Sequence, residues 1–241
     1  MVEKVGKFLF RWRGYLPLIL LAIFYKVFVS PENVELKLGE LWGHLFEVFC
    51  LSVSVTGLIV RALIRGQVPE ETSSRSTKRL KAKTLNTTGF YSIVRHPIYV
   101  LGNFPIFLGI LLFTQIWWIA LIGVVLFWVY YLPIMKAEEK FLEQKFGETW
   151  KRWAKITPFL FPNFKNWQPS SVAFSWKKAF RKESSTLLVI LTTYSLIDSL
   201  RDYFIEKNLD LFWIVVLITG FCFYLSVKIS RENKFLFSKK N

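Results

Sequence analysis

The sequence is poor in the residues that build disulfide frameworks and metal centres. Its 241 residues include only two cysteines and two histidines. Cys50 and Cys222 each lie inside an apolar stretch, so we expect buried free thiols, with no disulfide and no metal site. Acidic residues are scarce as well, because 17 Asp and Glu face 32 Lys and Arg, which leaves a formal net charge of +15.

Apolar and aromatic residues are abundant despite this charge. Hydrophobic residues make up 53% of the chain, with 24 Phe, 10 Trp and 9 Tyr. A basic balance is typical of nucleic-acid-binding proteins, but such domains are not this apolar, and a disordered basic tail is excluded for the same reason. We therefore predict no nucleic-acid partner and expect an integral membrane protein whose charges lie in its loops.

Long apolar runs support this class. A helix needs roughly 20 predominantly apolar residues to cross a bilayer, and about six stretches approach that length. Lys26 interrupts the first stretch and Asp198 lies near the end of the fifth, so these two are the weakest. The sequence predicts an all-α, multi-pass membrane protein with five to six transmembrane helices, at 14–34, 41–64, 97–114, 116–135, 185–200 and 209–227.

The distribution of Lys and Arg predicts the orientation. The loops before the first span, after the second and fourth, and after the sixth are basic, and Arg61 and Arg65 count among the charges that follow the second span. The positive-inside rule then places both termini in the cytoplasm. The basic surface there would attract anionic phospholipids. The predicted segments are an N-terminal pair of helices with a basic loop, a core, and a C-terminal transmembrane extension, at 1–84, 85–167 and 168–241.

One polar stretch stands out at the start of the third span. Pro97 suits the first position of a helix, which puts Arg95 and His96 at the cytoplasmic mouth of the span. A helix N-terminus carries free N–H groups and positive partial charge, and it therefore favours an anion. Tyr99 follows His96 by three residues and is expected on the same helix face. Gly102, one turn later, permits close approach of a helix or a ligand.

The third and fourth spans predict a helical hairpin with nearly equal arms that turns at Gln115. Its second arm returns Glu138 and Glu139 to the cationic residues at the start of the first arm. A cluster with both charge signs and an imidazole suits a zwitterionic ligand, such as an amino acid group with its carboxylate and ammonium. The following residues, 141–153, mix aromatic and charged side chains and predict a helix in the membrane interface.

Each of these residues also has a simpler interpretation. Arg95 and His96 can be ordinary flanking residues of a span, and Tyr99 an ordinary interfacial anchor. The Glu pair can be a solvated helix segment, and Asn103 can form a hydrogen bond between helices. Taken singly, these interpretations are favoured. The hairpin brings the residues to one depth, however, and this convergence favours a functional site.

Together the motifs resemble the isoprenylcysteine carboxyl methyltransferase family, which belongs to a larger group with the phospholipid N-methyltransferases. The similarity covers residues 85–164. It rests on Gly-x-Tyr, Arg-His-Pro-x-Tyr, Glu-Glu and Phe-Gly motifs followed by a proline. The matching residues are Gly89, Tyr91, Arg95, His96, Pro97, Tyr99, Gly102, Glu138, Glu139, Phe146, Gly147 and Pro162.

The resemblance implies a membrane enzyme that transfers a methyl group from S-adenosylmethionine, and the predicted topology gives it a cytoplasmic active site. Arg95 and Glu139 would act in catalysis, and Arg95 with Asn103 would bind the acceptor. No metal is needed, because the methyl donor is already activated. The residues that would bind the cofactor are Tyr91, His96, Pro97, Tyr99, Val100, Leu101, Gly102 and Glu138.

The motifs leave the methyl acceptor open. A lipid or lipidated substrate with an anionic carboxylate or phosphate oxygen is favoured, because the site is rich in cations. Ile134 departs from the carboxyl methyltransferase pattern, which has an arginine there. Phospholipid N-methylation is the alternative within the class. Weaker alternatives are a sterol-reductase-like NADPH enzyme and a non-catalytic scaffold or transporter, and the oligomeric state is open.

Overall fold

The computed structural model of the protein describes residues 8–9, 33–69, 82–207 and 211–238. Within these ranges the protein is helical, and an isolated antiparallel bridge between Gly89 and Gln168 is the only strand-like pairing. The predicted span at 14–34, with Lys26, lies almost entirely outside the described residues.

The described elements are all helical. They are α4 (Asn33–Leu38), α5 (Glu40–Gln67), α6 (Phe90–Ile93), the π-helix η1 (Ile98–Asn103), α7 (Phe104–Phe113), α8 (Trp117–Phe146), α9 (Glu148–Ile156), the 3-10 helix η2 (Phe164–Asn166), α10 (Trp176–Arg201), the π-helix η3 (Asp202–Glu206) and α11 (Leu211–Ser238).

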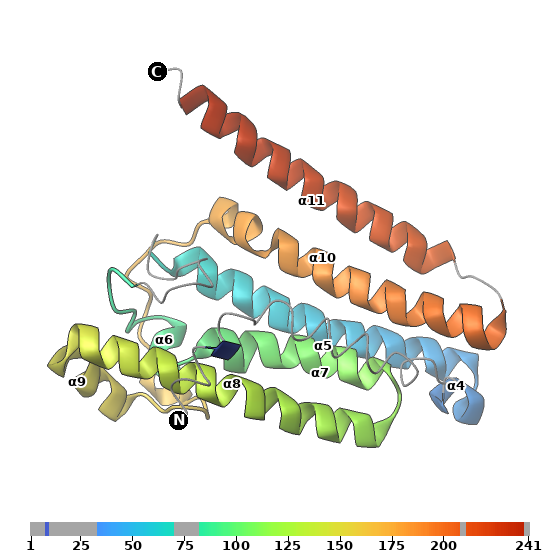
Figure 1. Cartoon of the computed structure of the whole chain (residues 1–241), viewed down its shortest axis with the longest axis horizontal. Coiled ribbons are helices and arrows are strands. Elements are labelled where there is room, and N and C mark those ends of the chain that lie inside the picture. Colours follow the sequence, from blue (N-terminus) through green and yellow to red (C-terminus); the bar gives the residue numbers. More distant parts are fainter. Residues whose placement is uncertain (1–7, 10–32, 70–81, 208–210, 239–241) are drawn as a thin grey trace.

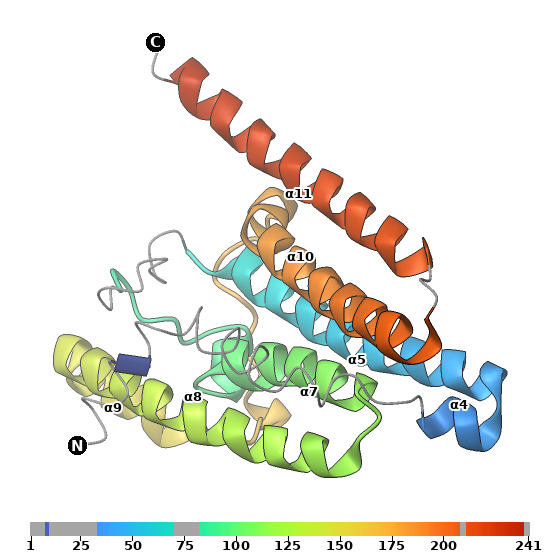
Figure 2. The same ribbon diagram turned by 45° about the vertical axis from the view of Figure 1, so that its right-hand side comes forward.

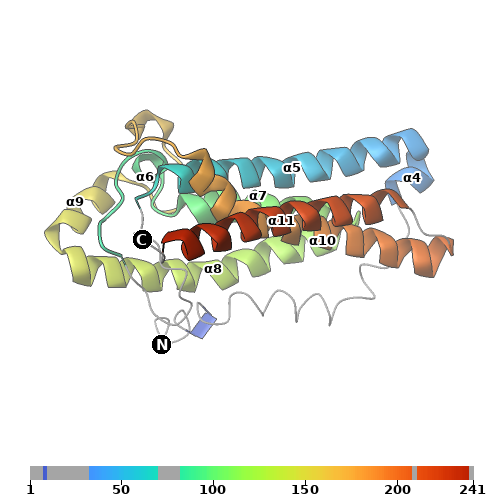
Figure 3. The same cartoon turned by 90° about the horizontal axis from the view of Figure 1, so that it is seen from above.

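The long helices lie side by side in the order α8, α7, α5, α10 and α11 (Figures 1 and 2). Helix α5 is central, because it packs against η1 and α7 on one side and against α10 on the other. Helix α11 packs on α10 and then diverges from the bundle (Figure 1). Figure 3 shows α6, α9 and the start of α10 at one end of the bundle and α4 at the opposite end.

Three of the described helices are long and apolar enough to cross a membrane: α5, α8 and the first 20 residues of α11. They coincide with the spans predicted at 41–64, 116–135 and 209–227. The span predicted at 97–114 is a shorter apolar helix made of η1 and α7. The span predicted at 185–200 lies in α10, which does not reach the apolarity of the other three because polar residues line its buried side. A total of six spans and the orientation of the termini stay predictions.

The turn of the hairpin lies at Gln115, where the sequence predicts it. Gln115 has a φ of 56°, which reverses the chain between α7 and α8. Its side-chain Oε1 accepts a hydrogen bond from the backbone N–H of Val34 at 2.8 Å, and its backbone oxygen accepts one from Asn33 Nδ2 at 3.3 Å. The start of α4 therefore fixes the tip of the hairpin.

Helices α5 and α7 approach closely along a seam of small residues. A Cβ on Gly57 would lie 2.6 Å from the backbone oxygen of Gly102, and one on Gly109 would lie 2.3 Å from Ser54 Oγ. The Ser54 hydroxyl donates to the backbone oxygen of Ile106 at 2.9 Å. Small residues at such a seam let helix backbones pack closely in a membrane, where hydrophobic attraction between helices is weak.

Two details of the predicted architecture are wrong. The residues 141–153 do not form a single helix, because Gly147, at a φ of 52°, ends α8 and begins the separate helix α9. Cys50 is buried as predicted, but Cys222, on α11, is exposed.

Candidate active site

The backbone that carries Arg95 and His96 is held by the segment that follows α9. After α6 the chain is extended at Val94, with φ −154° and ψ 144°. The N–H of Arg95 donates to the backbone oxygen of Pro158 at 3.0 Å, and Ile93 accepts from the N–H of Asn163 at 2.9 Å. These hydrogen bonds hold the residues just before η1 against the segment that follows α9.

Arg95 forms an ion pair with the end of the hairpin. Its Nη1 lies 2.8 Å from Glu139 Oε1 on α8, and its Nε donates to the backbone oxygen of Thr157 at 2.8 Å. The guanidinium carbon lies 5.8 Å from the ring centre of Phe159. Charge-assisted bonds of this kind are among the stronger hydrogen bonds in proteins, so the pair sets the orientation of both side chains.

His96 lies between two carboxylates and is only 6% exposed. Its Nδ1 is 3.8 Å from Glu138 Oε2, and its Nε2 is 3.5 Å from Glu139 Oε1. The edge of Phe159 covers the ring, at 5.4 Å between centroids. Within the described part of the chain, the buried Nε2 has no hydrogen-bond partner. A buried polar atom without a partner is costly, so this nitrogen is suited to a ligand or to a transferred proton.

Tyr99 connects η1 to the second carboxylate. Its hydroxyl donates to Glu138 Oε1 at 2.8 Å, and its ring lies 5.0 Å from that of Tyr131 on α8. The hairpin thus brings together Arg95, His96, Tyr99, Glu138 and Glu139, as its equal arms lead us to expect.

The remaining predicted residues on the third span lie along η1. The segment is a π-helix, a form that is often found at functional sites and that the sequence does not predict. Asn103 ends η1, and its Nδ2 donates to Tyr131 Oη at 3.4 Å. Pro97 directly precedes η1, and Tyr99 and Gly102 are buried within it, whereas Val100 and Leu101 are partly buried.

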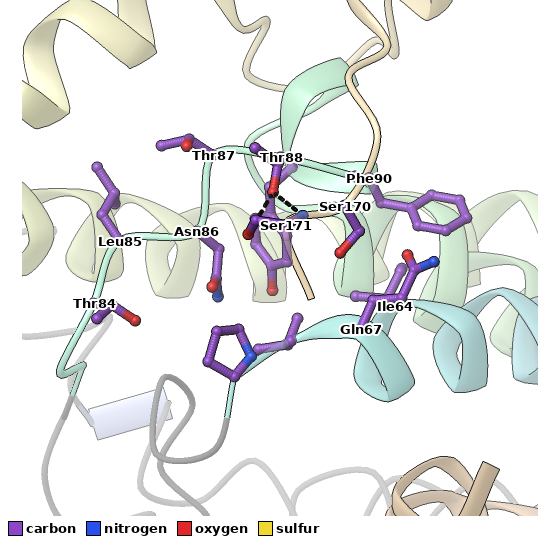
Figure 4. A pocket seen from close by; sticks show the side chains of 14 residues that line it. Ile64, Gln67, Thr84, Leu85, Asn86, Thr87, Thr88, Phe90, Ser170 and Ser171 are labelled. Carbon is purple, nitrogen blue, oxygen red and sulfur yellow. Dashed lines mark hydrogen bonds between the residues drawn. The ribbon is translucent and has the colours of Figure 1, made fainter. Parts of the chain in front are cut away.

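Tyr91 lines a cavity of about 240 Å³. Figure 4 shows this cavity from close by. Burial raises the pKa of the Tyr91 hydroxyl above its ordinary value, and the charge of Glu138 raises it further. The Tyr91 hydroxyl therefore lies within electrostatic reach of the Glu138 carboxylate. The walls of the cavity come from the end of α5, the strand-like stretch before α6, and the segment before α10, with the polar side chains of Gln67, Thr84, Asn86, Thr87, Thr88, Ser170 and Ser171.

Hydrogen bonds between two lining residues hold one part of the cavity wall in place. The backbone N–H of Ser171 donates to Thr88 Oγ1 at 3.2 Å, and the two hydroxyl oxygens are 3.3 Å apart, as Figure 4 shows. The buried Gln67 Oε1, in contrast, lacks a hydrogen-bond partner among the described residues.

Sequence reasoning missed a buried ionic cluster next to Gly102. Arg61 was expected in a loop but lies within α5, where it is 7% exposed. Its Nε donates to Glu183 Oε2 on α10 at 2.9 Å, and Arg65 Nε lies 3.0 Å from Glu183 Oε1. The signal was present in the helical spacing, because Arg61 lies four residues after Gly57 on the buried face of α5.

No group of three His, Cys, Asp or Glu side chains in the described residues is arranged to hold a metal ion.

Comparison with known families identifies the class. Residues 48–149 match the model of a family described as phospholipid methyltransferase. This family is shared by the isoprenylcysteine carboxyl methyltransferases and the phospholipid N-methyltransferases, so the resemblance seen in the motifs is confirmed. The chain therefore carries a phospholipid methyltransferase domain from within α5 to the start of α9, which indicates a membrane methyltransferase. No curated protein and no solved structure gave a match.

Proposed function

We propose that the protein is an S-adenosylmethionine-dependent methyltransferase that acts on a lipid or lipidated substrate at an anionic carboxylate or phosphate oxygen. The observation that carries the proposal is the cluster of Arg95, His96 and Tyr99 with Glu138 and Glu139, inside a phospholipid methyltransferase domain and close to a polar cavity.

The residues present fit the cofactor. Its methionine part carries an ammonium beside the sulfonium, and the Glu pair suits both cations. The orphaned His96 Nε2 offers one further polar contact. The hydroxyl and amide groups of the cavity suit a nucleoside, and Gln67 Oε1 can accept a hydrogen bond from a nucleobase amino group. Tyr91 connects the charged cluster with the cavity, since it lines the cavity and the charge of Glu138 raises the pKa of its hydroxyl.

The chemistry requires alignment more than acid or base catalysis. Bound S-adenosylmethionine supplies a methyl group on a sulfonium, which is activated for displacement. A carboxylate or phosphate oxygen carries its negative charge already, so Arg95 needs only to orient it. Phe159 and Tyr131 form apolar walls that exclude water from the cluster. Holding two reactants in line and away from water can contribute roughly 7–11 kcal/mol to a barrier reduction.

The proposed site faces the cytoplasm of a multi-pass membrane protein with both termini on that side. Helix α9 supports this orientation. Its buried face carries Trp150 and Trp153, while Lys151, Arg152 and Lys155 are exposed. The tryptophan face packs inside the protein, so the exposed basic side chains are the part of α9 that suits an anionic lipid surface. The soluble cofactor would arrive from the cytoplasm and the lipid acceptor from the bilayer.

Calorimetric titration of the purified full-length protein with S-adenosylmethionine tests the cofactor. We expect saturable binding that His96→Ala weakens and Glu139→Gln weakens further, because the latter also frees Arg95. Glu143→Gln is the matched control, since it makes the same change one turn further along α8. A folded protein that does not bind S-adenosylmethionine would contradict the proposal.

Methyl transfer identifies the acceptor class. Tritiated S-adenosylmethionine is supplied with phosphatidylcholine vesicles containing either phosphatidic acid or phosphatidylethanolamine, or with N-acetyl-S-farnesyl-cysteine. We expect label in the phosphatidic acid or in the farnesyl-cysteine. Label in phosphatidylethanolamine alone would assign the protein to amine methylation, with His96 Nε2 as the proton acceptor. Mass spectrometry of membrane lipids with and without the protein then identifies the natural product by the mass of one added CH₂ unit.

A further inference from the structure

The side chain of Arg61 crosses from α5 onto η1 beside the proposed site. Its Cγ occupies the space next to Gly102, where an added Cβ would lie only 2.2 Å away. The absence of a side chain at Gly102 is therefore what lets Arg61 pass. Beyond this point its Nη1 donates to Asn103 Oδ1, and its Nη2 lies 3.4 Å from both Glu183 Oε1 and Thr186 Oγ1.

This contact fixes which way the Asn103 carboxamide faces. A guanidinium has only donors, so the atom of Asn103 that faces Arg61 must be the carbonyl oxygen. The amide nitrogen then faces the opposite way, toward Tyr131 on α8, and its two N–H groups are donors. The Asn103 side chain thus points its N–H donors, and not its carbonyl oxygen, toward Tyr131 on α8, the second arm of the hairpin.

The direction of these donors is toward the proposed site. Tyr131 Oη, which receives the amide N–H at 3.4 Å, belongs to a ring 5.0 Å from that of Tyr99. Tyr99 in turn donates to Glu138. The Asn103 amide therefore lies one turn beyond Tyr99, where η1 continues into the apolar helix α7, and on the proposed topology this is the side from which a lipid acceptor would come.

The ionic partner of Arg61 comes from outside the family domain. Glu183 lies on α10, beyond the matched residues 48–149, and its side chain is buried. It holds Arg61 and Arg65 together. Breaking a buried ion pair is strongly destabilising, so this cluster holds the guanidinium of Arg61 in one place.

Resting on the proposed function, we propose that Arg61, held by Glu183, is a positioning residue that turns the Asn103 N–H groups toward an anionic oxygen of the methyl acceptor. The acceptor is thereby a lipid phosphate or the carboxylate of a lipidated molecule. Helix α10 contributes to acceptor recognition without contacting the acceptor.

Three single variants of the full-length protein test this role. Asn103→Asp keeps the shape and the contact to Arg61 but removes the donors. Arg61→Lys keeps a cation beside Glu183, but a point charge cannot bridge two partners as a guanidinium fork does. Arg65→Lys is the matched control, because it makes the same change beside the same Glu183 and leaves the contact between Arg61 and Asn103 intact.

The measurements separate acceptor binding from cofactor binding. Calorimetry gives the Kd of S-adenosylmethionine. Methyl transfer to phosphatidic acid in phosphatidylcholine vesicles and, separately, to N-acetyl-S-farnesyl-cysteine gives KM and kcat, and the two acceptors distinguish a phosphate from a carboxylate. With whichever acceptor the wild type uses, we expect Asn103→Asp to raise KM roughly tenfold or more, because a donor to a charged oxygen is lost and a like charge is introduced. Arg61→Lys is expected to raise KM by several-fold.

The control results decide between positioning and simple support of the fold. We expect the cofactor Kd to stay within about twofold of the wild type in all three variants, and Arg65→Lys to keep the wild-type KM. The double variant Arg61→Lys/Asn103→Asp should lose no more than Asn103→Asp, because orientation no longer matters once the donors are gone. Equal KM values in Arg61→Lys, Asn103→Asp and Arg65→Lys, or a parallel loss of cofactor binding in all three, would overturn the inference alone. A wild type that neither binds S-adenosylmethionine nor transfers a methyl group would overturn the proposed function and the inference with it.

Discussion

Gly57→Ala perturbs the contact on which the position of η1 depends. The added Cβ would lie 2.6 Å from the backbone oxygen of Gly102 and 2.9 Å from the backbone nitrogen of Ile106. Non-bonded heavy atoms are most stable about 3.5–4.0 Å apart. Because both neighbours are backbone atoms in helices, neither can rotate away, and α5 must separate from η1 and α7.

The expected loss of stability follows from this separation. A gap of about 0.5–1 Å forfeits a quarter to a half of the dispersion energy of the contacts that it opens, and overpacking substitutions cost about 1–3 kcal/mol. The same shift stretches the bond from Ser54 Oγ to the Ile106 oxygen, at 2.9 Å, which adds about 1 kcal/mol. Alanine regains about 1 kcal/mol by its higher helix propensity. The net loss is about 2 kcal/mol, which corresponds to a decrease in Tm of about 4–8 °C for a chain of this size.

Thermal unfolding of the detergent-solubilised protein, followed by tryptophan fluorescence, measures this change. Gly220→Ala is the control, since its added Cβ meets the terminal methyl group of Leu191, at 2.4 Å, and a flexible side chain can move aside. We expect Gly220→Ala to lower Tm by no more than about 2 °C. If Gly57→Ala were as stable as Gly220→Ala, the close backbone contact between α5 and η1 would be incorrect.

Three further predictions concern individual side chains. Tyr99→Phe removes the hydrogen bond to Glu138 at 2.8 Å and is expected to weaken binding of S-adenosylmethionine roughly tenfold in calorimetry, and unchanged affinity would argue against a role of Glu138 in cofactor binding. Burial raises the pKa of Tyr91, so the stability that its protonated hydroxyl contributes is complete below the ordinary pKa of about 10 and is lost as the pH rises above it. The Tm of the wild type should therefore fall more steeply than that of Tyr91→Phe between about pH 9 and 11, and parallel curves would contradict the shift. In folded, solubilised protein, N-ethylmaleimide should reach the buried Cys50 only after denaturation, which mass spectrometry of the intact protein can count, and labelling of Cys50 in the folded protein would contradict its burial.

The hairpin and its cluster were predictable because they depend on local properties. Two apolar runs of similar length defined the two arms of the hairpin, and the polar Gln115 between them marked the turn. Helix length alone then determined that Glu138 and Glu139 return to the level of Arg95. The π-helical winding of η1 was not predictable, because no pattern in its own residues distinguishes it from an α-helix.

The buried Arg61 was assigned to a loop because the positive-inside rule counts charges by position along the chain and ignores helix faces. Helix α5 continues to Gln67, and Arg61 lies on its inner face. The second half of the pair, Glu183, is 122 residues away and lies on a helix outside the family domain. No local pattern connects two such residues, so only the fold could bring them together.

The arrangement of formal charges supports an anionic acceptor. At the mouth of the hairpin, the carboxylates of Glu138 and Glu139 lie around Arg95 and His96. Beside Asn103 lies the guanidinium of Arg61, which pairs with Glu183. Methyl transfer from a sulfonium to a carboxylate or phosphate oxygen removes the positive charge of the sulfur and one negative charge of the acceptor. Carboxylates where the sulfonium would bind and N–H donors where the anion would bind suit both charged reactants. An amine acceptor, which is a cation before it loses its proton, would meet the N–H donors of Asn103, and these cannot accept a hydrogen bond from it.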